Sequence, residues 1–194
     1  MTISVPGRNA TRLVLFNFFE PLLGTDNFPS YVTTVYPADP FPTEQDYNGY
    51  ISTVGPNLNG SSAVLAITMY DQEVRSKFAM TGWSSVNDML YLPVTIKIYF
   101  MSRASGSLFA TPEYIPAVQA QLDYDIIVDY IEELVSEYPT FNSSYISLAG
   151  KDPTGITHQQ SELFQDPNGM AYYLVGSITF TVEVQIVNAN LFTF

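Results

Sequence analysis

Residues 172–187 read YYLVGSITFTVEVQIV, and this stretch decides the fold. From Ile178 to Ile186, apolar side chains take every second position and polar side chains fill the positions between them. A period of two predicts a β-strand with one dry face and one wet face. Because so long a strand is not stable alone, it needs paired neighbours and a layer that covers its apolar face.

The sequence supplies both the neighbours and the cover. Residues 91–101, YLPVTIKIYFM, alternate in the same way and predict a second long strand that pairs with the first. Residues 115–138 carry apolar side chains at helical spacing and predict a long amphipathic helix over the sheet. The predicted apolar stripe comprises Val118, Leu122, Ile126, Tyr130 and Leu134, flanked by Ile127, Ile131 and Val135.

Another helix is predicted near the start of the chain. Residues 9–23, NATRLVLFNFFEPLL, have Asn9 as the expected N-cap and Gly24 as the stop. This helix is apolar on most sides, which indicates burial against more than one surface, either in the core or against a partner. Shorter strands are expected at residues 31–36, 63–75 and 145–148, and residues 156–164 are expected to form a hairpin with residues 171–187.

These elements predict an α+β fold: a largely antiparallel sheet covered by one long amphipathic helix and the N-terminal helix. At 194 residues the chain can bury one good core, so residues 1–194 are expected to form a single domain. Residues 37–62, rich in Pro and Gly, are expected to form a long loop. Its aromatic residues indicate an arm that packs either on this domain or on a neighbouring subunit.

Charge is the most unusual global property. Seven Lys and Arg stand against 19 Asp and Glu, for a net charge of -12. Such a chain repels phosphate backbones, so specific nucleic-acid binding is not expected. The long helix concentrates the acids on the face opposite its apolar stripe, with no Lys or Arg among them. The excess serves either general solubility or an acidic surface that meets a partner.

No motif in the sequence indicates an enzyme, a metal site or a cofactor. The chain has no cysteine and one histidine, His158, which we interpret as an ordinary surface residue. Glu162 is too far along the same expected strand to share a metal with it. The beginning of the sequence lacks the pattern of a secretion signal, and no apolar run reaches the roughly 18 residues of a membrane span. We therefore expect a soluble, non-enzymatic protein without cofactors.

The order of elements resembles that of the tail-terminator and tail-completion proteins of tailed bacteriophages. The order comprises an apolar N-terminal helix, strands, a long Pro-rich loop, the strand YLPVTIKIYFM, the helix IPAVQAQLDYDIIVDYIEELVSEYP, a short strand and a closing hairpin through GITHQQSELFQDPNGMAYYLVGSITFTVEVQIV. The resemblance implies a structural subunit of the virion, assembled in the host cytoplasm, that forms a homo-oligomeric ring, a hexamer, around the DNA passage between neck and tail. Neighbouring neck and tail-tube proteins would be its other partners.

The resemblance also implies roles for particular residues. Aromatic side chains of the Pro-rich segment and the chain end would form the subunit interface: Phe41, Tyr47, Tyr50, Phe192 and Phe194. The long helix would turn its acids to a DNA channel or to a partner: Asp125, Asp129, Glu132 and Glu133. Alternatives are another phage structural subunit, such as a tail-tube or head-closure protein, and an enzyme or small-ligand-binding domain with a cleft behind the Pro-rich segment.

Overall fold

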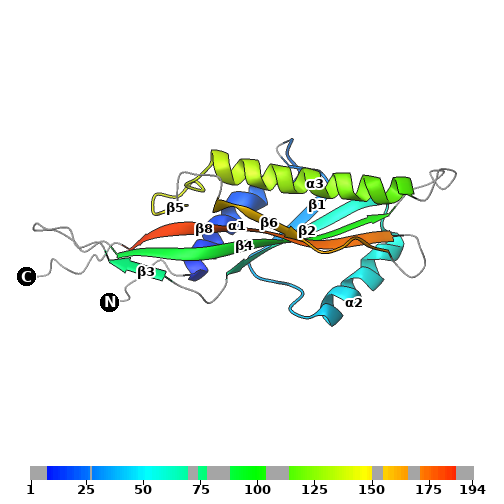
Figure 1. Ribbon diagram of the computed structural model, residues 1–194, viewed down its shortest axis with the longest axis horizontal. Coiled ribbons are helices and arrows are strands. Elements are labelled where there is room, and N and C mark those ends of the chain that lie inside the picture. Colours follow the sequence, from blue (N-terminus) through cyan, green and yellow to red (C-terminus); the bar gives the residue numbers. More distant parts are fainter. Residues whose placement is uncertain are drawn as a thin grey trace, which may run out of the picture.

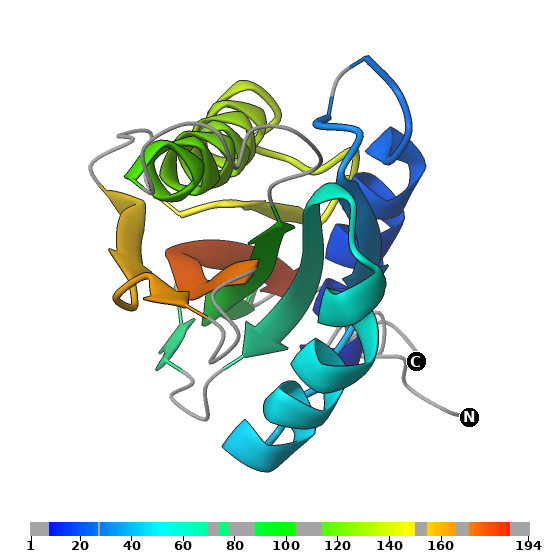
Figure 2. The same ribbon diagram turned by 90° about the vertical axis from the view of Figure 1, so that its right-hand side faces the viewer.

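The computed structural model describes residues 8–26, 28–69, 74–77, 88–103, 114–149, 155–165 and 171–186. It is built on one curled sheet with the order β1-β2-β4-β8-β5 (Figures 1 and 2). β4 (Asp88–Arg103) and β8 (Ala171–Ile186) form its centre and pair along their full length, from Asp88 with Ile186 to Arg103 with Ala171. The predicted pairing of the two long strands is therefore confirmed, and so is the α+β class.

Shorter strands flank this central pair. β2 (Gly60–Met69) runs antiparallel to β4, and β1 (Val32–Tyr36) adds to β2 in the one parallel pairing among the described strands. β3 (Val74–Lys77) pairs with β4 beyond the end of β2. On the other side, β5 (Ile146–Leu148), β6 (Thr157–Gln160) and β7 (Phe164–Gln165) all pair with β8, so the predicted closing hairpin is present but broken between β6 and β7.

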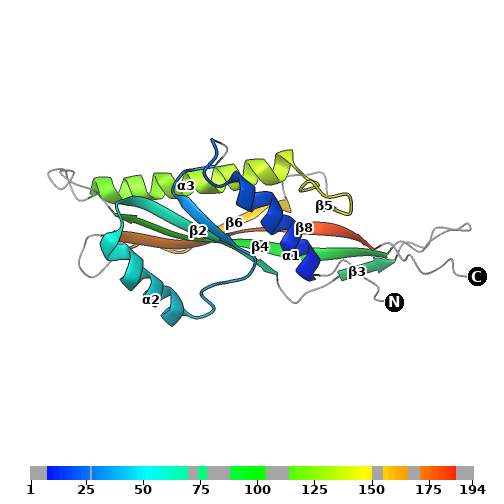
Figure 3. The same ribbon diagram turned by 180° about the vertical axis from the view of Figure 1, so that it is seen from behind.

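Two helices cover one face of the sheet. α3 (Tyr114–Glu137) lies along β4 and β8, and α1 (Arg8–Phe19) lies over β1 and β2 (Figures 1 and 3). The central strands supply this core with side chains at alternate positions, as the sequence predicts: Leu92, Val94, Ile96, Ile98, Phe100, Leu174, Ile178, Phe180, Val182 and Val184. α1 begins at Arg8, so Asn9 lies inside the helix and is not its N-cap. A short 3-10 helix, η1 (Glu20–Leu22), follows, and Gly24 stops it with a positive φ of 72°.

The opposite face of the sheet carries α2 (Glu44–Val54), a helix where the sequence predicted a loop. Thr43 caps it: the Thr43 hydroxyl accepts the backbone N–H of Asp46, and the Asp46 carboxylate accepts the backbone N–H of Thr43. This reciprocal pair satisfies two backbone donors that a helix N-terminus otherwise leaves open. A second 3-10 helix, η2 (Gly55–Asn57), leads from α2 into β2.

α2 builds a second, smaller core. Its Tyr47 packs on Val64 and Ala66 of β2 and Tyr99 of β4, the side chains that point away from α1 and α3. Phe41 joins this cluster with its ring 4.8 Å from that of Tyr99. α2 thus covers part of the second face of the sheet. The prediction of a long Pro-rich loop at residues 37–62 is wrong, because Glu44–Val54 is helical and Gly55–Asn57 forms a 3-10 helix.

A candidate subunit interface on α3

α3 has two apolar faces, and only one of them faces the sheet. The buried side chains are spaced so that they line one side of the helix: Ala120, Tyr124, Ile127, Val128, Ile131, Leu134 and Val135. The first three residues of the predicted stripe lie on the other side. Val118 is 52% exposed, Leu122 51% and Ile126 42%. The prediction that these three residues face the core is therefore wrong, whereas Leu134 and the flanking Ile127, Ile131 and Val135 are buried as predicted.

Val118, Leu122 and Ile126 follow one another at intervals of four, so they form a continuous exposed row on α3. Asp129 and Glu133 are exposed and continue the same side of the helix toward its C-terminus, and Asp125 lies beside them half-buried. We call these six residues the outer face of α3. Glu132 lies half-buried at its edge. The four acids that the sequence singled out therefore lie on or next to an exposed apolar row.

The acidic side chains of α3 make different contacts. Asp123 points to the sheet edge, where its Oδ2 accepts the Ser61 hydroxyl at 2.5 Å and its backbone carbonyl accepts the Tyr31 hydroxyl at 2.7 Å. Asp125 accepts a bond of 2.8 Å from Gln121 one turn earlier. Asp123 therefore ties α3 to β2, while the carboxylates of Asp129 and Glu133 remain on the exposed side.

A groove of about 540 Å³ adjoins the C-terminal half of the outer face, between α1, η1 and α3. Phe18, Leu22 and Leu134 contribute apolar side chains to its lining, and Asp26, Glu133 and Glu137 contribute carboxylates. Glu133 belongs to both the groove and the outer face of α3. An apolar lining with carboxylates suits the aliphatic stem and charged head of a Lys or Arg side chain.

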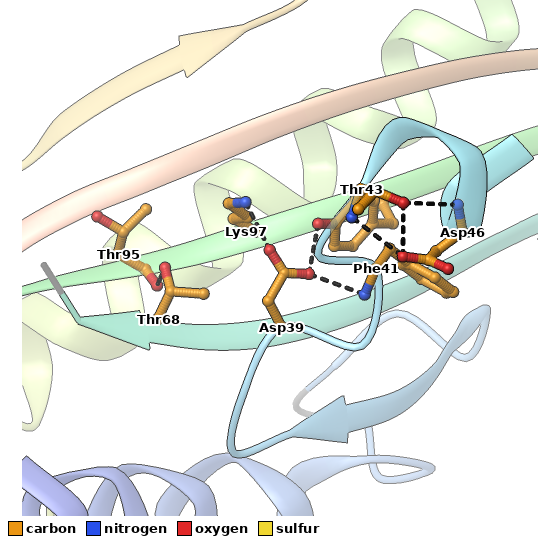
Figure 4. A network of polar contacts seen from close by, with 8 residues as sticks. Asp39, Phe41, Thr43, Asp46, Thr68, Thr95 and Lys97 are labelled. Atoms are coloured by element: carbon orange, nitrogen blue, oxygen red, sulfur yellow. Dashed lines mark hydrogen bonds and ion pairs between the residues drawn. The ribbon is translucent and has the colours of Figure 1, made fainter.

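A polar network lies on the opposite face of the sheet (Figure 4). The Lys97 ammonium contacts Asp39 Oδ2 at 2.6 Å, and Asp39 Oδ1 accepts the Tyr99 hydroxyl at 2.6 Å and the Phe41 backbone N–H at 3.0 Å. Partial burial alone would raise the pKa of Asp39, but the hydrogen bonds and the positive charge of Lys97 lower it on balance. The same burial and the bond to Asp39 raise the pKa of Tyr99. The network fastens the segment before α2 to β4.

Of the five aromatic residues predicted for a subunit interface, three lie in the described part of the chain. Phe41, Tyr47 and Tyr50 pack on this chain's own β2 and β4, and Tyr47 is only 7% exposed. Of the two options that the sequence left open for this segment, packing on its own domain is the one observed. Phe192 and Phe194 lie outside the described residues. The exposed apolar surface on α3 was missed by sequence reasoning, although its spacing was visible.

His158 is exposed on β6, as expected, and Glu162 lies beyond the end of that strand. His158 is not isolated, because its Nε2 lies 2.9 Å from the buried Tyr124 hydroxyl. Among the described residues, no group of three or more His, Asp or Glu side chains could hold a metal ion. Nor does the described part of the chain contain a helix long and apolar enough to span a membrane.

Neither a protein-family model nor a curated protein matches the chain.

Proposed function

We propose that this chain is a structural subunit of a tailed-bacteriophage particle, forming a tail-terminator-like ring around the DNA passage where neck and tail meet. The observation that carries the proposal is the outer face of α3, which combines three exposed aliphatic side chains with acids on a helix that itself carries no Lys or Arg. Apolar side chains gathered on one exposed face, bordered by polar ones, are typical of a surface that meets another protein.

The charge of this face favours a ring over a two-fold dimer. A two-fold contact sets a patch against its own copy, so Asp129 and Glu133 would meet the same acids of the other subunit. Like charges at such a contact cost free energy, which disfavours the symmetric arrangement. The α3 face therefore fits a different surface of the next subunit, and head-to-tail contacts of this kind close into rings or continue into filaments.

The element order and the net charge add support from the sequence. The order of elements predicted from the sequence resembles that of tail-terminator and tail-completion proteins, and the structure follows this order with α2 in place of the expected loop. A net charge of -12 repels the phosphate backbone, so DNA would not adhere to the wall of a passage built from such subunits. The proposed role is structural, and the partners are copies of the chain together with neck and tail-tube proteins.

Solution mass tests the ring. Light scattering coupled to size exclusion, over a concentration series, should give an integer multiple of 21.6 kDa, and negative-stain images should show closed rings with a central opening. Antibodies against the chain should then label the head–tail junction of the particle. Labelling along the tail or within the head vertex would indicate a tail-tube or head-closure subunit instead. A monomer at every concentration that is also absent from particles would overturn the proposal.

A further inference from the structure

Two adjoining grooves lie beside the C-terminal half of α3. The groove of about 540 Å³ between α1, η1 and α3 shares Asn17, Phe18 and Asn142 with a second groove of about 300 Å³. The second groove lies between α1 and residues 141–145, in the connection from α3 to β5. We call the two grooves together the α1–α3 trough. Figure 3 shows the two helices that flank it.

The two grooves differ in charge. Asp26, Glu133 and Glu137 line the larger one, which we call the acidic groove. The smaller one is lined by apolar side chains such as Phe18 and Phe141 and by uncharged polar ones, and we call it the uncharged groove. None of the described residues that line either groove is a Lys or Arg. The trough therefore matches a ligand that is cationic at one end and apolar at the other.

The polar and aromatic residues of the trough are typical of a protein-binding surface. Asn17 and Asn142 are exposed and line both grooves, and a carboxamide can both donate to and accept from a peptide backbone. Tyr138 lines the acidic groove and Tyr145 the uncharged groove, and both are exposed. Tyrosine is enriched where proteins meet. Phe18, whose ring lies 5.5 Å from that of Phe141, is held by the core beneath.

The basic side chains that the structure describes are not suited to fill the acidic groove of a second copy. Lys97 is paired with Asp39 on the opposite face of the sheet, and Arg103 donates to backbone carbonyls of η2. Arg8 and Arg12 are half-buried on α1. The charge of the groove therefore favours a segment of a different protein.

We infer that the α1–α3 trough binds an extended segment of a different protein. A Lys or Arg of that segment lies in the acidic groove with its charged head near Asp26, Glu133 and Glu137, and an apolar side chain lies in the uncharged groove. Alternate side chains of an extended chain point to the same side, so the basic and apolar positions are separated by an even number of residues. The inference goes beyond the proposed ring, because it concerns a partner of different sequence.

Peptide selection tests the inference without a known partner. A displayed library of short random peptides is selected against the full chain and counter-selected against the variant Asp26→Asn with Glu137→Gln. These two acids line the acidic groove but do not belong to the outer face of α3. We expect enriched peptides with a Lys or Arg at an even spacing from an apolar residue. Enrichment of no peptide, or of peptides without a basic residue, would overturn the inference.

Affinity measurements then locate the charge. The most enriched peptide is synthesised with a fluorescent label, and its Kd is measured by anisotropy. Replacing its basic residue with an uncharged analogue, citrulline for Arg or acetyl-lysine for Lys, should weaken binding roughly tenfold. Asp26→Asn with Glu137→Gln should weaken the charged peptide by a similar factor and leave the uncharged one unaffected. A loss of equal size for both peptides would overturn the inference.

The matched control is Glu44→Gln with Glu162→Gln, which removes as much charge at exposed positions elsewhere. This variant should bind the peptide as wild type does. A loss as large as that of the groove variant would show attraction to the net charge alone and overturn the inference.

Two further readouts separate the trough from the contact between copies. Amide NMR signals of Asn17 and Asn142 should shift on addition of the peptide, and shifts confined to Val118, Leu122 and Ile126 would overturn the inference. Light scattering should give the same mass with and without peptide. Dissociation of an oligomer by the peptide would show that a second copy fills the trough and would overturn the assignment to a different protein. A monomeric chain that binds the peptide would overturn the ring alone.

Discussion

The hydroxyl of Tyr124 on α3 lies 2.9 Å from Nε2 of His158 on β6, although Tyr124 itself is fully buried. The phenol reaches that far because it passes over Gly176 of β8, the one position in the apolar row of that strand without a side chain. Burial raises the pKa of Tyr124, and the nearby charge of Asp125 raises it further, so the phenol stays protonated. This contact fixes the distance between α3 and the sheet.

Replacing Gly176 with alanine should therefore destabilise the protein. A Cβ at this position would overlap the Tyr124 hydroxyl and lie 2.6 Å from its Cζ, so α3 or the ring must shift. Overpacking of this kind costs about 1–3 kcal/mol, measured by thermal or urea unfolding. Gly49→Ala on α2 is the control, since a Cβ there meets nothing within 4 Å and should leave stability equal or slightly higher. Equal stability of Gly176→Ala and wild type would contradict the packing described.

The same substitution, Ile→Ala, made once on each apolar face of α3 should have different effects on stability. Ile131 is fully buried against the sheet, so Ile131→Ala should cost about 2–5 kcal/mol of unfolding free energy through lost burial and the cavity left behind. Ile126 is 42% exposed on the outer face, so Ile126→Ala should cost well under about 1 kcal/mol. Urea unfolding of dilute protein measures both. Similar costs would mean that the outer face is covered within the subunit.

The central strands could be predicted from the sequence because their period of two is unambiguous. One face of β4 and β8 packs in the main core, and their pairing has no irregularity. Core residues such as Val94, Ile96 and Ile98 therefore take every second position of the sequence without a break. Which side of α3 faces the sheet could not be predicted in the same way. Its sequence carries two apolar rows, and the choice between them depends on the space over Gly176 that receives Tyr124, a long-range relation that periodicity does not encode.

α2 was missed although its signals are in the sequence. Thr43 and Asp46 form the spacing of a capping box, and Tyr47, Tyr50 and Val54 recur at helical intervals. The surrounding prolines outweighed these signals, yet they lie at residues 37, 40, 42 and 56, all outside the helix. The acids of α3 were predicted to lie opposite the row of Val118, Leu122 and Ile126, and this placement is wrong. The row is exposed, and Asp129 and Glu133 lie on the same side of the helix. An apolar row on a helix is assigned to the core unless the structure shows a second one.

Low pH should weaken the contact between β4 and the segment before α2. The folded-state pKa of Asp39 is lowered, so its carboxylate adds stability at neutral pH, and this contribution is lost as the pH falls below the unfolded value of about 3.9 and through the folded one. Asp39→Asn should be less stable than wild type by about 1–2 kcal/mol at pH 7, and the gap should close in the acid range. Urea unfolding from pH 7 to pH 2.5 measures it. Asp129→Asn, at an exposed position, controls for the loss of one charge; a gap for Asp39→Asn that stayed constant with pH would argue against the ion pair with Lys97.

The aromatic cluster under α2 gives a test of whether this segment serves the subunit or the assembly. Tyr47 is 7% exposed and packs on Val64, Ala66 and Tyr99, so Tyr47→Ala should cost about 3 kcal/mol or more of unfolding free energy. The same substitution at Tyr36, which is 39% exposed at the end of β1, should cost about 1 kcal/mol or less. Both are measured by urea unfolding at low protein concentration, where association does not contribute, and self-association is followed in parallel by light scattering. A Tyr47→Ala variant that kept the stability of the isolated subunit but lost association would instead place this side chain in a contact between subunits. The expected result is the reverse, because the ring of Tyr47 is already enclosed by its own sheet.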